Sequence, residues 1–233
     1  MCNSVSLEII QEKLFVEETG TSKAMRAEDE YWEVEWINLD FIGALKCRNC
    51  SNYTMFGGVG NVEHFVDYDQ ITGEMDEGYY NSLKPRYFQP PLYLFTIAED
   101  CPQIVKDEII SSFKLFWFDL SSCANKIRIS LELLLNHEKV KRFIISKGKR
   151  NKITLHNRIA EFKKKKPEVA SYLEAIKWIG NSGSHIGNLR RIDLLEAYEL
   201  LEHSLNKLYN DKEPQLKKMS KEIIARRGIR KRK

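Results

Sequence analysis

The chain has 233 residues, of which 42% are hydrophobic and 30% are charged. This composition allows one or two globular domains with a real core and excludes a fibrous or low-charge chain. No stretch approaches the about 18 apolar residues that a membrane-spanning helix needs, and the first ten residues do not have the pattern of a secretory signal. We therefore expect a cytoplasmic protein without membrane association.

Charge divides the chain into two parts. Residues 1–100 hold 7 Lys and Arg against 18 Asp and Glu, and residues 101–233 hold 30 against 15, so the net charges are −11 and +15. Two interpretations remain open. The halves neutralise each other, within one chain or across a dimer, or the basic half binds a polyanion such as RNA or DNA.

The N-terminal part gives two kinds of pattern. In residues 1–30, a few apolar residues could begin a helix that the segment 19–22 interrupts, so we expect an N-terminal arm that is disordered or docked on a partner. Residues 31–100 are predicted to be an acidic β-rich subdomain, with strands expected at 31–36, 41–45, 53–56 and 64–68. The glycines of residues 57–60 are interpreted as a hairpin turn, and prolines 85, 90 and 91 exclude a continuous helix before residue 100.

Residues 101–211 follow a helical period, which predicts a bundle of about five helices. The helices are expected at residues 104–118, 121–135, 154–162, 167–179 and 193–208, with Thr154 as the N-cap of the third. The basic stretch 140–152 is interpreted as a helix end followed by a loop at Gly148. Residues 212–233 are expected to be a basic tail. The predicted fold class is therefore α+β, a small antiparallel β-rich region followed by a helical bundle.

Several segments occur in a specific order: Trp36, Phe41, CRNC at 47–50, FQPPL at 88–92, CP at 101–102, FW at 116–117, NKIRISLE at 125–132, LHNRI at 155–159 and IKWIGNSGSH at 176–185. This ordered set resembles a prokaryotic family of unknown function that occurs alone and fused to restriction and other defence proteins. The resemblance implies a fold akin to the HEPN helical bundles, many of which are ribonucleases or partners of nucleotidyltransferases. It favours a nucleic-acid-associated protein of antiphage defence that forms a homodimer.

HEPN ribonucleases that act without metal carry an Arg, a polar residue beside it and a His a few positions later. Here Asn181 and His185 fit the polar and His positions, whereas Gly180 stands at the Arg position. An imidazole can transfer protons near neutral pH, and a cation can stabilise a phosphorane. If the chain is an endoribonuclease, we predict that His185 is the acid and base and that Asn181 orients it.

The missing Arg leaves two candidates for the cation, Lys177 one helical turn earlier and Arg128 on another helix. Gly180 itself is expected to end its helix in the left-handed conformation. A structural interpretation stays open, in which Asn181 and His185 only hydrogen-bond the helix end. A second match to the pattern, Arg150 followed by His156, is interpreted as chance, with His156 capping a helix or facing solvent.

Basic residues gather in three stretches of the second half. The predicted contacts to RNA or another polyanion are Lys141, Arg142, Lys149, Arg150, Lys152, Lys164 and Lys165. They form a phosphate-tracking surface if they fall on one face. The alternative is a non-catalytic module that docks a protein effector or an antitoxin partner. The four tryptophans, at 32, 36, 117 and 178, are expected in the core.

Cys47 and Cys50 form a single CxxC pair, whereas a zinc ribbon needs two. Paired cysteines in a core or turn and a structural zinc site are the two interpretations, and the first is favoured. No Walker loop, GxGxxG segment or nucleophile elbow is present. The sequence thus predicts no metal and no cofactor.

Overall fold

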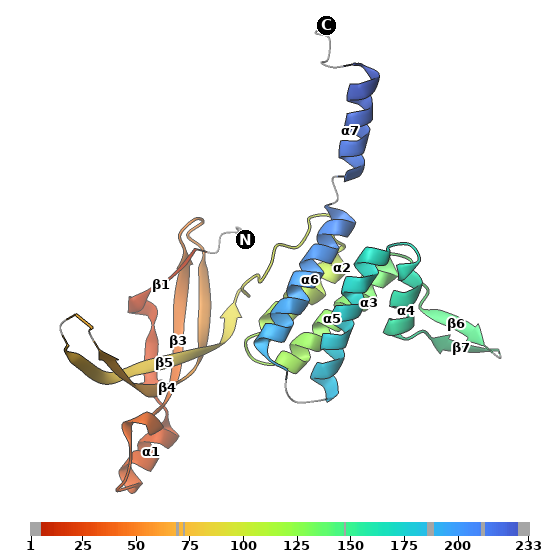
Figure 1. The fold of residues 1–233 in the computed structure, drawn as a ribbon. Coiled ribbons are helices and arrows are strands. Elements are labelled where there is room, and N and C mark those ends of the chain that lie inside the picture. Colours follow the sequence, from red (N-terminus) through yellow and green to blue (C-terminus); the bar gives the residue numbers. More distant parts are fainter. Residues whose placement is uncertain are drawn as a thin grey trace. The chain divides into compact units, whose positions relative to one another are not determined.

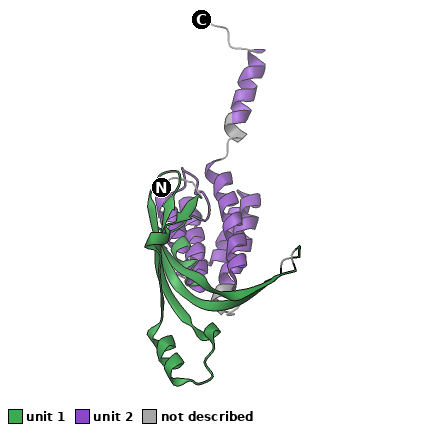
Figure 2. Cartoon of the chain, turned by 90° about the vertical axis from the view of Figure 1, so that its left-hand side faces the viewer, with its two compact units in different colours: residues 1–93, 113–119 green, residues 94–112, 120–233 purple. Residues whose placement is uncertain are grey.

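The computed structural model describes residues 6–68, 70–71, 73–146, 148–185, 189–210 and 213–227, without the side chains of residues 182–185 and 213–215. Its fold is α+β, as predicted: an antiparallel sheet is followed by helices (Figure 1). The chain folds into two compact units (Figure 2), which we call the sheet unit (residues 1–93 and 113–119) and the helical unit (residues 94–112 and 120–233). None of the described helices is long and apolar enough to cross a membrane.

The sheet unit is built on five antiparallel strands. They are β1 (Leu7–Ile9), β2 (Phe15–Glu18), β3 (Asn38–Cys47), β4 (Tyr53–Tyr68) and β5 (Met75–Gln89). Strand β3 pairs with β1, β2 and β4, and β4 pairs with β5. Helix α1 (Gly20–Glu28) follows β2, and the 3-10 turns η1 (Gln11–Lys13) and η2 (Val34–Trp36) lie in the connections.

The predicted N-terminal arm is part of the sheet over its described residues. The reason is burial: Leu7, Leu14 and Val16 pack against the apolar core formed by Phe41, Leu45, Phe56 and Phe88. The segment expected to interrupt a helix instead begins one, because the Thr19 side chain accepts a hydrogen bond from the Ser22 amide at 3.2 Å and caps α1.

The glycines at residues 57–60 do not form a turn, contrary to the prediction. Strand β4 runs through them, because β3 and β5 approach it too closely for side chains. A Cβ at Gly58 would lie 2.3 Å from the Lys84 carbonyl oxygen, and one at Gly57 would lie 2.8 Å from the Phe41 carbonyl oxygen. The pairing of β4 with β5 shifts here in a β-bulge.

Two further expectations for the sheet unit need correction. Residues 31–36 are not a strand but contain the 3-10 turn η2, in which the Trp36 amide bonds to the Glu33 carbonyl at 3.0 Å. Pro85 lies inside β5, a strand that the sequence did not predict. A proline is tolerated there because β5 is an edge strand and Pro85 adjoins the bulge.

The helical unit contains the five predicted bundle helices, α2 (Gln103–Leu115), α3 (Leu120–His137), α4 (Leu155–Lys163), α5 (Pro167–His185) and α6 (Arg191–Tyr209). The predicted apolar stripes are buried, including Ile127 and Leu131 on α3 and Leu173 on α5. Helix α5 packs against α3, α4 and α6. The Thr154 hydroxyl accepts from the Asn157 amide, so the predicted N-cap of α4 is confirmed. The expected tail contains a further helix, α7 (Glu213–Ala225).

A β-hairpin replaces the loop predicted between α3 and α4. Strands β6 (Phe143–Ser146) and β7 (Lys149–Lys152) pair antiparallel, with Gly148 at a φ of 73° in the turn. This left-handed conformation favours glycine. Figure 1 shows the hairpin extending away from the helices of its own unit.

A buried arginine joins α4 to the end of α3. The guanidinium of Arg158 donates to the carbonyl oxygens of Glu132 at 3.2 Å and Val140 at 3.3 Å, and to Asn136 Oδ1 at 2.7 Å. Only 2% of this residue is exposed, and burial lowers its pKa from the ordinary value. The contacts join α4 to the last turns of α3 and to Val140, which follows that helix.

We expect Gly58→Ala to destabilise the sheet unit by about 2 kcal/mol or more, because the new Cβ meets the β5 backbone, which cannot move aside as a side chain can. Urea denaturation followed by circular dichroism measures this. Gly20→Ala is the matched control, since an added Cβ there meets no described heavy atom within 4 Å. Equal unfolding midpoints for the two variants would contradict the close approach of β4 and β5.

Candidate nucleic-acid interface

The structure places four of the seven predicted phosphate-binding residues at the β6–β7 hairpin. Arg142 precedes the hairpin, and Lys149, Arg150 and Lys152 lie on β7; all four are exposed. The guanidinium carbon of Arg150 lies 3.8 Å from the centre of the Phe143 ring, a cation–π contact that holds it on one side of the hairpin.

The other three predicted cations surround the C-terminal half of α4. Lys164 lies 2.6 Å from the Glu161 carboxylate and lowers its pKa, and the charges of Lys141 and Lys165 lower it further. Lys141 and Arg142 are neighbours in the chain, so the two groups adjoin in sequence. We call Lys141, Arg142, Lys149, Arg150, Lys152, Lys164 and Lys165 together the basic surface. Residues 139–166 contain 12 Lys and Arg and one acid.

Arg128 lies at the edge of the basic surface, on α3. Its guanidinium is 4.0 Å from one carboxylate oxygen of Glu132, and the Lys152 ammonium is 3.2 Å from the other. Glu132 thus links α3 to β7. The Arg128 side chain is 39% exposed, so a phosphate of a bound polyanion can approach it.

Gly180 does not end its helix, contrary to the prediction. Helix α5 continues to His185, and the left-handed glycines among the described residues are Gly73 and Gly148. A Cβ at Gly180 would lie 3.6 Å from the Cβ of Arg128 and from the Ala124 carbonyl oxygen. The helices α3 and α5 therefore lie close together here. Arg128 comes to stand beside the position at which the resemblance places an arginine.

Lys177 is less suited to phosphate contact than the sequence suggested. Only 3% of it is exposed, and its ammonium lies 3.1 Å from His156 Nδ1 on α4 and 3.7 Å from the centre of the Trp178 ring. Its charge is therefore directed into the contact between α4 and α5. Of the two predicted cations, Arg128 is the accessible one. His156 faces solvent, as one of the two expectations had it, with 57% of its side chain exposed, and it also contacts Lys177 and lies 3.8 Å from Glu174.

Trp178 is 59% exposed, whereas the sequence placed it in the core. Trp178, Asn181 and His185 follow one another at i, i+3 and i+7, a spacing that puts helical residues on one face. Asn181 is partly buried, and the side chain of His185 lies outside the described part of the structure. A helical wheel could have predicted the exposure of Trp178, because this residue lies outside the stripe of Leu173 and Ile176 that faces the core.

The described cysteines of the sheet unit are Cys47 and Cys50. Cys47 is buried and Cys50 is partly buried. Among the described residues, no three His, Cys, Asp or Glu side chains gather closely enough to hold a metal ion. In the helical unit, burial raises the pKa of Cys101 to about 11, so this thiol stays protonated at neutral pH.

We expect Gly180→Ala to stabilise the helical unit by up to about 1 kcal/mol, because alanine favours a helix and the 3.6 Å contacts leave room for its methyl group. Thermal unfolding followed by far-ultraviolet circular dichroism measures the change. A glycine that ended the helix in the left-handed conformation would give the opposite sign on substitution, and a lowered unfolding temperature would contradict a continuous α5.

Comparison with known families finds two matches. Residues 1–88 match the family described as a domain of unknown function (DUF8608), and residues 111–226 match the family described as a domain of unknown function (DUF4145). The first match falls in the sheet unit, and the second covers α3 to α7. No curated protein and no solved structure matches the chain.

Proposed function

We propose that this chain is a HEPN-like, nucleic-acid-associated protein of prokaryotic antiphage defence, and that its helical unit binds RNA through backbone phosphates. The observation that carries the proposal is the basic surface, whose seven cations are all exposed on the hairpin and beside α4. Its stretch of sequence has 12 cations against one acid. The ordered resemblance of residues 31–210 supplies the class of protein.

The charges of the basic surface favour a polyanion over a single small anion. Most of its cations are exposed, and the ion pairs of the described residues neutralise only Lys152 and Lys164 among the seven. Cations spread over two consecutive elements release counterions from a phosphate backbone, which gives affinity without sequence readout. Trp178 adds an exposed aromatic ring on which one base of a single strand can stack.

Cleavage of the bound RNA is the second step of the proposal. His185 takes the proton of a 2′-hydroxyl, the freed oxygen attacks the adjacent phosphorus, and the 5′-oxygen leaves with a proton, so a cyclic phosphate remains. Asn181 orients the imidazole, and Arg128 stabilises the charge on the phosphorane. Support comes from the position of Arg128 beside Gly180. The resemblance implies an arginine at this position in HEPN ribonucleases.

A protein-docking module is the second candidate function, favoured by a different observation. The core face of the sheet continues along the β4–β5 ribbon as an exposed apolar surface of Val66, Tyr68, Met75 and Tyr79, each at least 51% exposed. Residues 61–82 contain six acids and no Lys or Arg. A basic effector, an antitoxin or a second copy in a homodimer would be a partner of suitable charge.

We expect the triple variant Lys141→Ala, Lys149→Ala and Lys165→Ala to bind single-stranded RNA roughly tenfold more weakly at moderate salt, with the slope of log affinity against log salt reduced by about 2. Each lost cation removes about one phosphate contact. Fluorescence anisotropy of a labelled RNA over a salt series gives both numbers.

The matched control is Lys23→Ala, Lys46→Ala and Arg48→Ala, which removes the same charge from exposed positions of the sheet unit. Its salt slope should equal that of the wild type. The same slope in both triple variants would contradict binding at the basic surface. No RNA binding by the wild type at moderate salt would leave the docking module as the function.

We expect His185→Ala to lose RNA cleavage by a factor of about 100 or more while keeping its RNA affinity, because a positioned acid and base contributes a rate factor of that size. The assay contains EDTA, which chelates divalent metal ions, so that contaminating metal-dependent nucleases are inactive. His137→Ala is the control, a half-exposed histidine at the end of α3. Cleavage that survives His185→Ala, or that the control loses equally, would remove the proposed chemistry and leave the binding proposal standing.

A further inference from the structure

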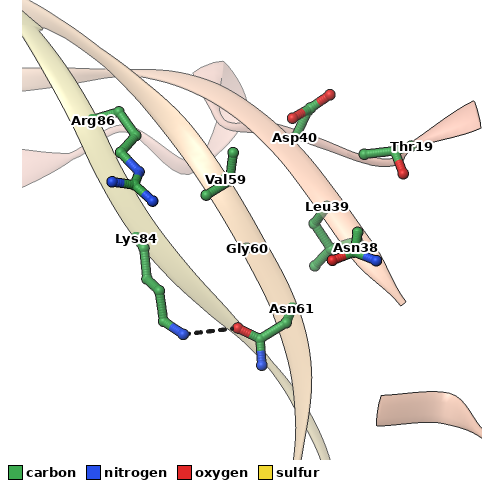
Figure 3. Close-up of a pocket in the computed structure, with 9 residues that line it drawn as sticks. All are labelled: Thr19, Asn38, Leu39, Asp40, Val59, Gly60, Asn61, Lys84 and Arg86. Carbon is green, nitrogen blue, oxygen red and sulfur yellow. Dashed lines mark hydrogen bonds between the residues drawn. The ribbon is translucent and has the colours of Figure 1, made fainter. Parts of the chain in front are cut away.

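A polar pocket of about 380 Å³ lies on the sheet unit, over strands β3, β4 and β5 (Figure 3). This volume lies within the range of small-ligand pockets, about 300–1,000 Å³. Its floor is Val59 and Gly60, and its rim carries Asn38, Asp40, Asn61, Lys84 and Arg86. The pocket belongs to the acidic half of the chain and shares no residue with the basic surface.

The pocket carries two cations and one acid, Asp40, in the half of the chain in which acids outnumber cations. Residues 1–100 hold seven Lys and Arg, and two of them, Lys84 and Arg86, line this pocket. The Lys84 ammonium is 3.0 Å from Asn61 Oδ1 and 3.8 Å from the Glu63 carboxylate. The guanidinium of Arg86 makes no hydrogen bond or ion pair with any described residue, so its donors are available to a ligand.

A β-bulge sets the position of Arg86. In β5, Pro85 pairs with Gly58 and Tyr87 pairs with Gly57, which leaves Arg86 as the extra residue without a partner on β4. Bulges change the direction of a side chain and are common beside binding sites. Figure 3 shows Lys84 and Arg86 on the same side of β5. This geometry requires glycine at position 58, because a Cβ there would lie 2.3 Å from the Lys84 carbonyl oxygen.

An apolar patch adjoins the two cations. Ile42, Gly57 and Tyr87 form the next row across β3, β4 and β5, and the Tyr87 hydroxyl lies 2.7 Å from where a Cβ of Gly57 would be. The ring therefore lies over the glycine. Ile42 and Tyr87 are each 44% exposed and Val59 is 41% exposed, so a flat group could pack on them.

We propose that this pocket binds a small ligand in which an anionic group, a phosphate or a carboxylate, is joined to a flat apolar ring. Arg86 pairs with the anion, bidentate where its geometry allows, and Lys84 supplies a second charge. The amides of Asn38 and Asn61 bond polar atoms of the ligand, and Tyr87 with Val59 packs against its ring. This site would give the chain a function beyond RNA binding, because it lies in the sheet unit and not in the helical unit.

The test is isothermal titration calorimetry of the full chain with three probes, adenosine monophosphate, inorganic phosphate and benzoate. We expect a ring-bearing probe to bind more tightly than inorganic phosphate. Arg86→Ala should weaken its binding by about tenfold or more, the effect of losing a charge-assisted hydrogen bond. Val59→Trp, which fills the floor without removing a charge, should weaken it as well.

Arg48→Ala is the matched control, an exposed arginine of the same unit whose partner is Glu8. It should bind like the wild type. Tighter binding of adenosine monophosphate than of benzoate identifies a phosphate ligand, and the reverse order identifies a carboxylate. No heat with any probe at millimolar concentration, full binding by Arg86→Ala, or an equal loss in Arg48→Ala would overturn the proposal. None of these results depends on whether the basic surface binds RNA.

Discussion

The contacts of one buried guanidinium hold the basic surface in place. Arg158 on α4 donates to carbonyl oxygens of Glu132 and Val140, which lie at and beyond the end of α3. The hairpin leaves the bundle just after Val140 and returns just before α4, so both of its ends adjoin the residues that Arg158 joins. A buried charge is costly unless its hydrogen bonds are made, and breaking them costs more than a surface ion pair contributes. This constraint places seven cations of separate stretches on consecutive elements.

Close backbone approach is the second organising feature, and glycines permit it differently in the two units. At Gly58 the neighbouring strand leaves no room for a Cβ, so the sheet carries a bulge that exposes Arg86. At Gly180 the contacts are ordinary, so two helices lie close and Arg128 stands beside the empty position. In both places the missing side chain brings an arginine from another position to a site. Arg86 is accessible to a ligand in the pocket of the sheet unit, and Arg128 is accessible to a phosphate at the helical unit. The function proposed for each site depends on that arginine.

The sequence predicted the helical unit well because its signals are local. Five helices, their buried stripes and the Thr154 cap depend on residues a few positions apart. The sheet unit was harder to predict, because its glycines at residues 57–60 are required by the close approach of strands β3 and β5, which are distant in sequence. The N-terminal residues were read as an arm because only the folded core shows what Leu7, Leu14 and Val16 contact. The cations of the candidate site are evident in the sequence, but Lys149, Arg150 and Lys152 lie on a hairpin where the sequence predicted a loop.

The burial of Lys177 could not be predicted, because its partner His156 lies on another helix and belongs to what was interpreted as a chance match. Trp178 was expected in the core because tryptophan is usually buried. Its position on the helical wheel of α5, however, lies off the buried stripe of Leu173 and Ile176. The left-handed end expected at Gly180 was wrong because glycine also serves close helix packing. The corrections at Lys177 and Gly180 concern contacts between α5 and a neighbouring helix.

The most direct test of this account is hydrogen exchange and RNA affinity in Arg158→Met, with Lys163→Met as the control that removes the same charge from an exposed position of α4. We expect the Arg158 variant to lose about 3 kcal/mol of stability. We also expect faster exchange in residues 140–158 and weaker RNA binding, although Arg158 is too buried to touch RNA. Unchanged exchange and affinity in this variant would show that the basic surface does not depend on the buried guanidinium.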